Sequence, residues 1–70
     1  MVEMKYVQSS NIEAIGYDSE AQELHVRFIA SGSYIYSGVP EHVYEEFMNA
    51  PSHGSYLNRM IKGVYQFQKA

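Results

Sequence analysis

Two tyrosines near the middle of the chain have the spacing of a stacking platform. Tyr34 and Tyr36 flank Ile35 in a segment rich in strand-forming residues, so alternation puts both rings on one face of a sheet. Such rings stack on unpaired bases in several sheet domains that bind single-stranded RNA. If helices cover the Ile35 face, the two tyrosines form an exposed platform. If helices cover the tyrosine face, which is the commoner arrangement, the rings pack beneath them with their hydroxyl groups at the rim.

A second set of candidate ligand-binding residues lies further along the chain. The loop containing Ser52 and Gly54 precedes a predicted helix, where free N–H groups favour an anion and glycine allows close backbone approach. Asn58 and Lys62 follow on that helix and could add a hydrogen bond and, from the side, a positive charge. The alternative, again the commoner one, is that Ser52 or Ser55 is an ordinary N-cap and that the basic residues are solvated.

No catalytic or metal-binding pattern is apparent. The three histidines (His25, His42 and His53) do not have the spacing of metal ligands, and the chain has no cysteine to join them. Serines and acidic residues occur together, but nothing in their order indicates a Ser-His-acid triad. We therefore expect no enzymatic activity, no catalytic residues, no cofactor and no metal.

Composition narrows the choice of partners and of cellular location. Five Lys plus Arg stand against eight Asp plus Glu, a net charge of −3, which is not typical of a protein held to nucleic acid mainly by phosphate contacts. A locally basic face is still compatible with this balance. No apolar run approaches the roughly 18 residues of a membrane span, and the first residues do not form a secretion signal. We expect a cytoplasmic protein with no membrane partner.

Period-two patterns predict a small antiparallel sheet. Residues 24–28 alternate apolar and polar side chains, and residues 12–17 and 33–39 are rich in strand formers. Hairpin-length connections join these segments, so the three strands should form an antiparallel meander, because parallel neighbours need a long crossover. Residues 1–8 have no clear period and are expected to be a lead-in or an edge strand.

Helical spacing follows the predicted strands. One helix is predicted from Pro40 to the residues before Pro51, because Val43, Tyr44, Phe47 and Met48 recur on one helical face. Proline suits a first turn and disfavours helix geometry in the residue before it. A second is predicted from an apolar face made of Leu57, Met60, Ile61 and Val64. The predicted class is α+β: a three-stranded meander followed by two short helices on one face, with a short extended segment near residues 65–67.

Several short motifs in a fixed order resemble the KTSC domain family. They are Ser9-Ser10, Gly16-Tyr17-Asp18, Tyr34-Ile35-Tyr36, Val39-Pro40-Glu41, and Ser52, Gly54, Tyr56, Asn58, Ile61 and Lys62. The family is named for a domain at the C-terminus of some lysyl-tRNA synthetases and also occurs as a stand-alone bacterial protein. The resemblance implies one domain of this type at residues 9–67, with a tail at 68–70, and an RNA-binding role without catalytic residues. One departure is Leu57, where an aromatic residue often precedes the asparagine.

These observations support a first hypothesis, a non-enzymatic module that binds RNA or another phosphate-bearing ligand. Tyr34 and Tyr36 would stack, Arg27 and Lys62 would neutralise phosphate, and Asn58 would donate a hydrogen bond. This arrangement requires both tyrosines to be exposed and both cations to lie on the same side of the sheet.

The alternative is a protein–protein interaction module, including one that binds a second copy of itself. Exposed tyrosines suit a protein interface as well as a nucleic-acid one, and the acidic composition suits it better. Salt separates the two hypotheses, because phosphate binding weakens steeply as salt rises and a tyrosine-centred protein contact does not.

Overall fold

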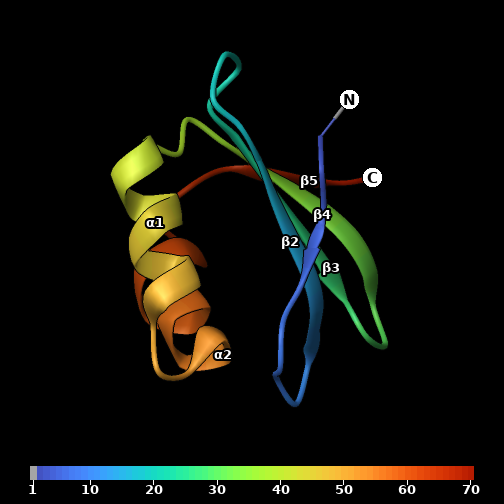
Figure 1. Cartoon of the computed structure of the whole chain (residues 1–70). Helices are drawn as coiled ribbons and strands as arrows, with labels where there is room; N and C mark the ends of the chain where they lie inside the picture. The colour runs from blue at the N-terminus through green and yellow to red at the C-terminus, as the bar shows by residue number, and fades with distance from the viewer. Residues whose placement is uncertain (1) are drawn as a thin grey trace.

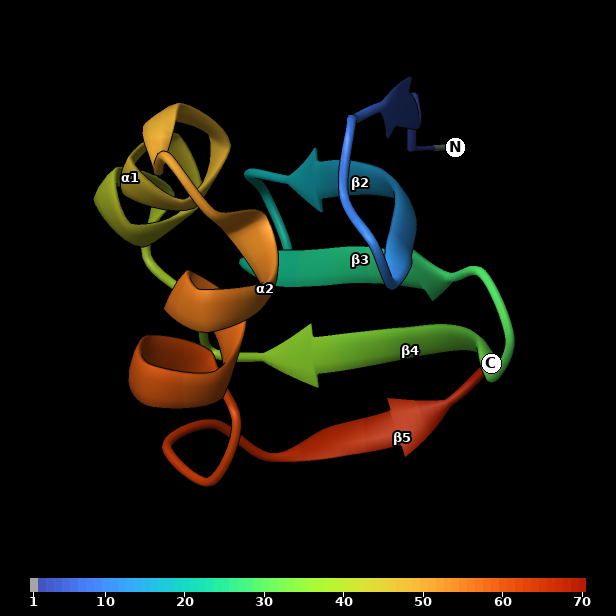
Figure 2. The same ribbon diagram turned by 90° about the horizontal axis from the view of Figure 1, so that it is seen from below.

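A computed structural model describes residues 2–70 as a sheet with one helix-covered face (Figures 1 and 2). The five strands, all antiparallel to their neighbours and ordered in space as in the chain, are β1 (Lys5–Tyr6), β2 (Ile12–Asp18), β3 (Glu23–Phe28), β4 (Gly32–Ser37) and β5 (Phe67–Lys69). Between β4 and β5 the chain forms α1 (Glu41–Asn49), α2 (His53–Tyr56) and a π-helical segment, η1 (Leu57–Ile61). None of the helices in residues 2–70 has both the length and the apolar character to span a bilayer.

The expected three-stranded meander is wrong, because the sheet has five strands. The three central strands lie within two residues of the predicted segments 12–17, 24–28 and 33–39, and the two ends of the chain add β1 and β5 at the edges. Residues 68 and 69, expected in a tail, belong to β5. Residues 5 and 6, within the 1–8 segment expected to be a lead-in or an edge strand, form β1; Met1 of that segment lies outside the described residues. These edge strands have two and three residues, too few to show a period, and β5 pairs with a strand about thirty positions earlier.

Strand register decides which face of the sheet carries which side chains. Val26 lies opposite Tyr34 and Leu24 lies opposite Tyr36, and directly paired residues point to the same face. Leu24 and Val26 are fully buried beneath the helices, so both tyrosines lie on the covered face. Ile35 points to the opposite face, which we call the open face.

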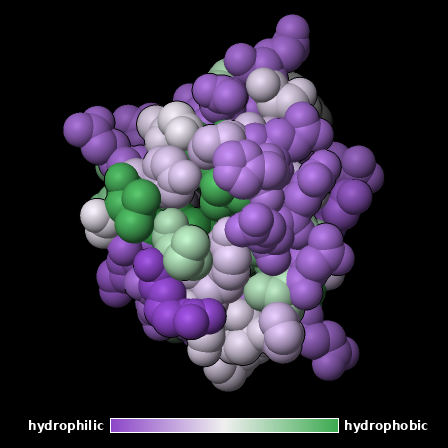
Figure 3. Space-filling model, turned by 90° about the vertical axis from the view of Figure 1, so that its left-hand side faces the viewer, coloured by the Kyte–Doolittle hydropathy of each residue, from purple (hydrophilic) through white to green (hydrophobic). Residues whose placement is uncertain are grey.

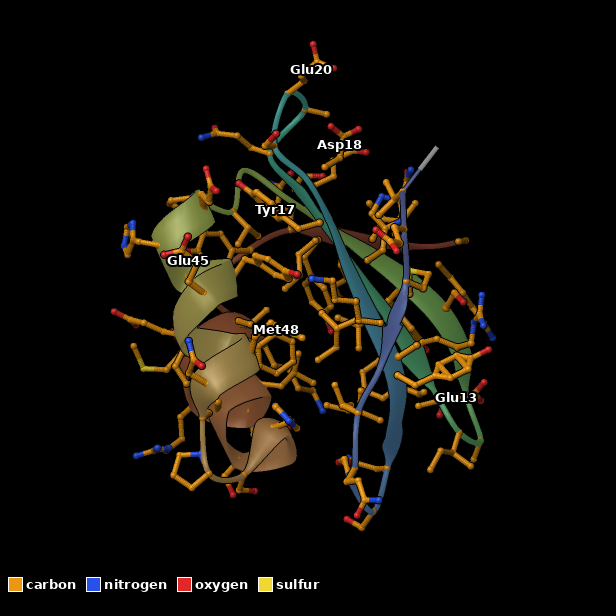
Figure 4. All side chains as sticks on the ribbon, viewed as in Figure 1. Glu13, Tyr17, Asp18, Glu20, Glu45 and Met48 are labelled. Atoms are coloured by element: carbon orange, nitrogen blue, oxygen red, sulfur yellow. The ribbon has the colours of Figure 1, made fainter. Side chains whose placement is uncertain are left out.

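The first helix forms as its apolar spacing predicts. Val43 and Phe47 are buried against the sheet, while Glu45 lies on the outer side of α1 (Figure 4). The helix ends at Asn49, two residues before Pro51. The apolar face of α1 therefore supplies the centre of the core.

The second helix begins after Ser52, a candidate N-cap in the sequence, and ends before Val64 of its predicted apolar face. Ser52 is its N-cap, since its hydroxyl oxygen accepts a hydrogen bond from the Ser55 N–H, and α2 begins at His53. The helix then widens into η1, where the Lys62 N–H donates to the Leu57 carbonyl at 2.7 Å, and it ends at Ile61. Val64, expected on the apolar face, consequently lies beyond the helix and is 63% exposed.

Candidate functional site

Two adjoining hollows are lined by the turn before β2 and the α2–η1 helix, and the larger also by the β3–β4 hairpin. The larger has a volume of about 430 Å³ and the smaller about 310 Å³. Ser10, Asn11 and Asn58 line both, so the two hollows are continuous. We call the pair the groove. Its lining includes Ser9, Ser10, Asn11, Phe28, Tyr34, Tyr36, Ser52, His53, Gly54, Asn58, Lys62 and Phe67.

Four aromatic rings form the base of the larger hollow, and we call them the aromatic floor: Phe28, Tyr34, Tyr36 and Phe67. Tyr34 contacts Phe28 edge-on and Phe67 at a tilt, each with ring centroids 5.4 Å apart, and Phe67 also lies 5.6 Å from Tyr36. Strand pairing creates this floor, because Tyr36 lies opposite Phe67 across β4 and β5. Tyr36 is only 4% exposed, whereas Phe67 is 56% exposed. The floor is thus anchored in the core at one end and open to solvent at the other.

Burial also affects the chemistry of the inner tyrosine. Removal from water, and then the neighbouring Tyr34, raise the pKa of Tyr36 above its usual value. Its phenol therefore stays neutral well above physiological pH, and the floor presents uncharged rings to whatever occupies the groove.

The smaller hollow is polar and tightly built. The Ser9 hydroxyl donates to the Asn11 Oδ1 atom at 3.1 Å and accepts from the Ile12 N–H at 3.3 Å. A Cβ atom placed on Gly54 would come within 3.0 Å of that same Asn11 oxygen. Any larger residue at position 54 would therefore have to displace Asn11, and glycine lets the turn before β2 pack directly on α2.

Charge is distributed unevenly around the molecule. No carboxylate among residues 2–70 lines either hollow, whereas Lys62 lines the larger one. Lys69 lies opposite Tyr34 across β4 and β5, so it shares the face of the aromatic floor. Figure 4 shows Glu13 on the open side of the sheet and Glu20 at the far turn. The groove is therefore locally positive on a protein of net charge −3.

Six of the seven predicted ligand-binding residues line the groove. Tyr34, Tyr36 and Lys62 line the larger hollow, Ser52 and Gly54 line the smaller, and Asn58 lines both. The idea of two exposed tyrosines is wrong, because the helices cover the tyrosine face and Tyr36 is buried.

Arg27 is the predicted residue that the fold places elsewhere. It pairs with Ala14 and Ser33 across the sheet and points to the open face, on the opposite side from Lys62. There its guanidinium lies 3.8 Å from the Glu13 carboxylate, and both side chains are partly exposed. Arg27 and Lys62 therefore do not act on one ligand, which corrects that part of the sequence-based arrangement.

Sequence reasoning missed the other six residues of this lining: Ser9, Ser10, Asn11, Phe28, His53 and Phe67. The one available signal was the extended segment expected near residues 65–67, since an added strand beside the tyrosine strand would bring Phe67 to the tyrosines. For Asn11 there was no signal, because its proximity to Gly54 depends on how the helix packs on the sheet.

The residues of the smaller hollow include Ser52 and His53, but they are not arranged as a nucleophile and base. The Ser52 hydroxyl is engaged with Ser55 at the helix start, and His53 Nδ1 lies 3.0 Å from the Phe47 carbonyl oxygen. The described residues also contain no group of three His, Cys, Asp or Glu side chains that could hold a metal ion.

Comparison with known proteins assigns the chain to a family. The model of the KTSC domain matches residues 8–65. The crystal structure of a KTSC domain protein from Yersinia pestis covers 100% of this chain and 99% of its own, with a TM-score of 0.98 and 37% sequence identity. Neither the family model nor this solved relative indicates a catalytic activity for the domain.

Relatives occur both as small proteins and within a large enzyme. A protein of Tsukamurella paurometabola is 41% identical over 59 residues, which is 84% of this chain and 88% of that protein. A lysine–tRNA ligase of Nostoc punctiforme is 36% identical over 62 residues, 89% of this chain but only 11% of the ligase. Since the family model and the solved structure span nearly the whole chain, the chain belongs to the KTSC domain family.

Proposed function

We propose that this domain is a non-enzymatic binding module whose groove takes single-stranded RNA. The observation that carries the proposal is the combination, in one groove, of a partly exposed aromatic floor with Lys62 and with no lining carboxylate from residues 2–70. Proteins that bind single strands combine stacking rings with a positive track for the phosphates. Bases stack on Phe67 and the open edge of Tyr34, and Lys62 and Lys69 lie beside the backbone.

The acidic composition does not oppose this function, because the carboxylates lie elsewhere. The two ion pairs within residues 2–70, Arg27 with Glu13 and His25 with Glu23, involve residues of the central strands whose side chains avoid the groove. Relatives named lysine–tRNA ligase contain a region similar to this chain, which is consistent with a role beside RNA. With two lysines near the floor, we expect weak, salt-sensitive binding.

Fluorescence anisotropy with a labelled single-stranded RNA of about eight nucleotides tests the proposal, since one small binding domain covers about 4–16 nucleotides. Affinity should fall several-fold between about 50 and about 200 mM salt. Lys62→Ala should weaken binding and flatten the salt dependence, whereas Arg27→Ala, which removes the same charge from the open face, should change neither. Absence of binding at the lower salt, or equal effects of the two variants, would contradict the proposal.

A second candidate function, binding to another protein, is favoured by exposed apolar side chains outside the groove's floor. Met60 is 47% exposed and Val64 63% exposed, and Figure 3 shows hydrophobic atoms gathered in one part of an otherwise largely hydrophilic surface. Strand β5 is also a free sheet edge that could pair with a second copy. Sedimentation of the wild-type domain beside Val64→Glu distinguishes this function, because self-association through this surface would be lost in the variant and would not weaken steeply with salt.

A further inference from the structure

The point where the two hollows join has features of its own. Asn11 and Asn58 both line it, one from the turn before β2 and the other from η1. Within residues 2–70 the Asn58 amide and the Asn11 Nδ2 group make no hydrogen bond, whereas Asn11 Oδ1 is occupied by the Ser9 hydroxyl. Two amides with free hydrogen-bonding groups therefore border the aromatic floor.

Asn11 is restrained from the side of its amide oxygen. Ser9 holds its oxygen at 3.1 Å, and Gly54 on α2 brings the helix within close contact of that same oxygen. Its Nδ2 group is then left as a donor of fixed orientation. Asn58, exposed on η1, supplies both a donor and an acceptor.

The dimensions of the larger hollow suit a small ligand. Its volume of about 430 Å³ is near the lower end of the range for sites that hold small molecules, roughly 300–1,000 Å³. A base within a duplex is stacked on both sides and its pairing edge is occupied, so it cannot lie on this floor. A single unpaired nucleotide offers one free face for stacking, a free base edge and a phosphate.

We propose, building on the RNA-binding function above, that the groove holds one unpaired nucleotide unit and that Asn11 and Asn58 read the edge of its base. The base stacks on Tyr34 and Phe67, the two amides hydrogen-bond to its donor and acceptor groups, and Lys62 lies beside its phosphate. The ligand chemistry is that of a nucleoside monophosphate, whether free or within a strand. Asn58 is then a residue that determines specificity, and Lys62 one that contributes affinity without preference among bases.

The test compares four single-stranded RNAs of equal length, each rich in a different base, together with the four free nucleoside monophosphates. Wild type should bind one base at least about fivefold more tightly than the weakest, as expected when an amide pairs with a base edge. Asn58→Ala should bring the four affinities close together, while Lys62→Ala should weaken all four by the same factor. Asn49→Ala is the matched control, because Asn49 lies on α1 with its amide bonded to the Glu45 carbonyl.

The outcomes separate this inference from the function on which it rests. A base preference that is lost only in Asn58→Ala supports the inference. If the free monophosphates show the same preference, a single nucleotide is sufficient for binding. If the monophosphates do not bind, the bound nucleotide must belong to a strand. RNA that binds wild type with no preference, or with a preference unaffected by Asn58→Ala, overturns the inference and leaves RNA binding intact. No binding of any RNA at low salt instead contradicts the proposed function itself.

Discussion

The two ends of the helix-covered sheet face use aromatic residues in opposite ways. At one end Tyr17 is stacked on Tyr44 of α1 with ring centroids 4.9 Å apart, and its hydroxyl donates to the Val39 carbonyl oxygen at 2.5 Å. At the other end Tyr34 contacts neighbouring rings of the sheet, and its hydroxyl has no hydrogen-bonding partner within residues 2–70. The first end joins the layers, and the second leaves rings that a ligand can reach.

The two ends also differ in the charged side chains that surround their aromatic rings. Burial, followed by the negative charges of Glu41 and Asp18, raises the pKa of Tyr17, so its phenol keeps its proton and its hydrogen bond. The groove has no such carboxylate among the described residues and carries Lys62 instead. Residues of similar type therefore serve folding where they are satisfied within the protein, and are available for binding where they are not.

Removing the ring of Tyr17 should have the largest effect on stability. We expect Tyr17→Ala to reduce the free energy of unfolding by about 3 kcal/mol, because a half-buried, stacked aromatic contact and a hydrogen bond to Val39 are both lost. That is a large part of the roughly 5–10 kcal/mol available to a domain of this size. Urea unfolding followed by circular dichroism measures it. A loss below about 1 kcal/mol would show that this end does not hold the layers together.

Removing the exposed ring at the other end should affect binding instead. We expect Phe67→Ala to weaken RNA binding about fivefold or more, since stacking of one base is worth about 1–3 kcal/mol. Its effect on unfolding should stay below about 1 kcal/mol, because the side chain is 56% exposed on an edge strand.

The matched control for that variant is Tyr6→Ala, which removes another exposed ring from the opposite edge strand, β1. It should leave RNA affinity unchanged in the same anisotropy titration. If the two variants weaken binding equally, the aromatic floor is not the stacking surface.

Removing single hydroxyl groups should distinguish the two ends through smaller changes in the free energy of unfolding. Tyr17→Phe should cost about 1 kcal/mol of stability, because the Val39 carbonyl loses its donor. Tyr34→Phe should cost close to nothing, since its hydroxyl bonds to no described residue. Parallel urea titrations of the two variants measure these changes in stability. Equal losses of stability in Tyr17→Phe and Tyr34→Phe would contradict the distinction between the two ends.

A further effect on stability is expected at alkaline pH. Burial, and then the hydrogen bond from its hydroxyl to Glu46 at 2.8 Å, raise the pKa of Tyr56 to about 12. The folded state therefore holds this proton more tightly than the unfolded state, whose tyrosines titrate near pH 10. The stabilisation is complete below about pH 10 and is lost as the pH rises toward 12.

Urea midpoints at about pH 9 and about pH 11 measure this loss, bracketing the ordinary pKa of tyrosine near 10. The fall between them should be smaller in Tyr56→Phe, which has no proton to lose, and Glu46→Gln should lie between that variant and wild type. An identical fall in wild type and Tyr56→Phe would mean that Tyr56 is not the group responsible.

The elements that the sequence could predict are those whose signal is local. Alternation at residues 24–28 and helical spacing around Val43 and Phe47 each identify an element from its own residues, and both are present. For β5 the sequence indicated only an extended segment near residues 65–67, because the three residues of this strand are ordered by pairing with β4, far away in the chain. For the same reason the sequence left open which sheet face the helices cover, and thus whether Tyr36 is exposed.

The groove was predictable in its helical part and not in its sheet part. Ser52, Gly54, Asn58 and Lys62 are close in the chain and follow one helix, so their convergence could be inferred from spacing. Asn11 reaches them only through packing of the turn before β2 against Gly54. The sequence-based arrangement put Arg27 beside Lys62, which is wrong. Strand alternation says which side chains share a face with Arg27, but not which of the two sheet faces the helices cover.

Whether the groove is the binding surface can be read residue by residue from an amide NMR titration of the isotope-labelled domain with a short single-stranded RNA at low salt. We expect shifts clustered along the groove and fading as salt rises, at Asn11, Tyr34, Asn58, Lys62 and Phe67. Resonances of the open face, such as those of His25 and Arg27, should stay unchanged. No shifts at low salt, or shifts centred on the open face, would contradict the assignment of the groove as the binding surface.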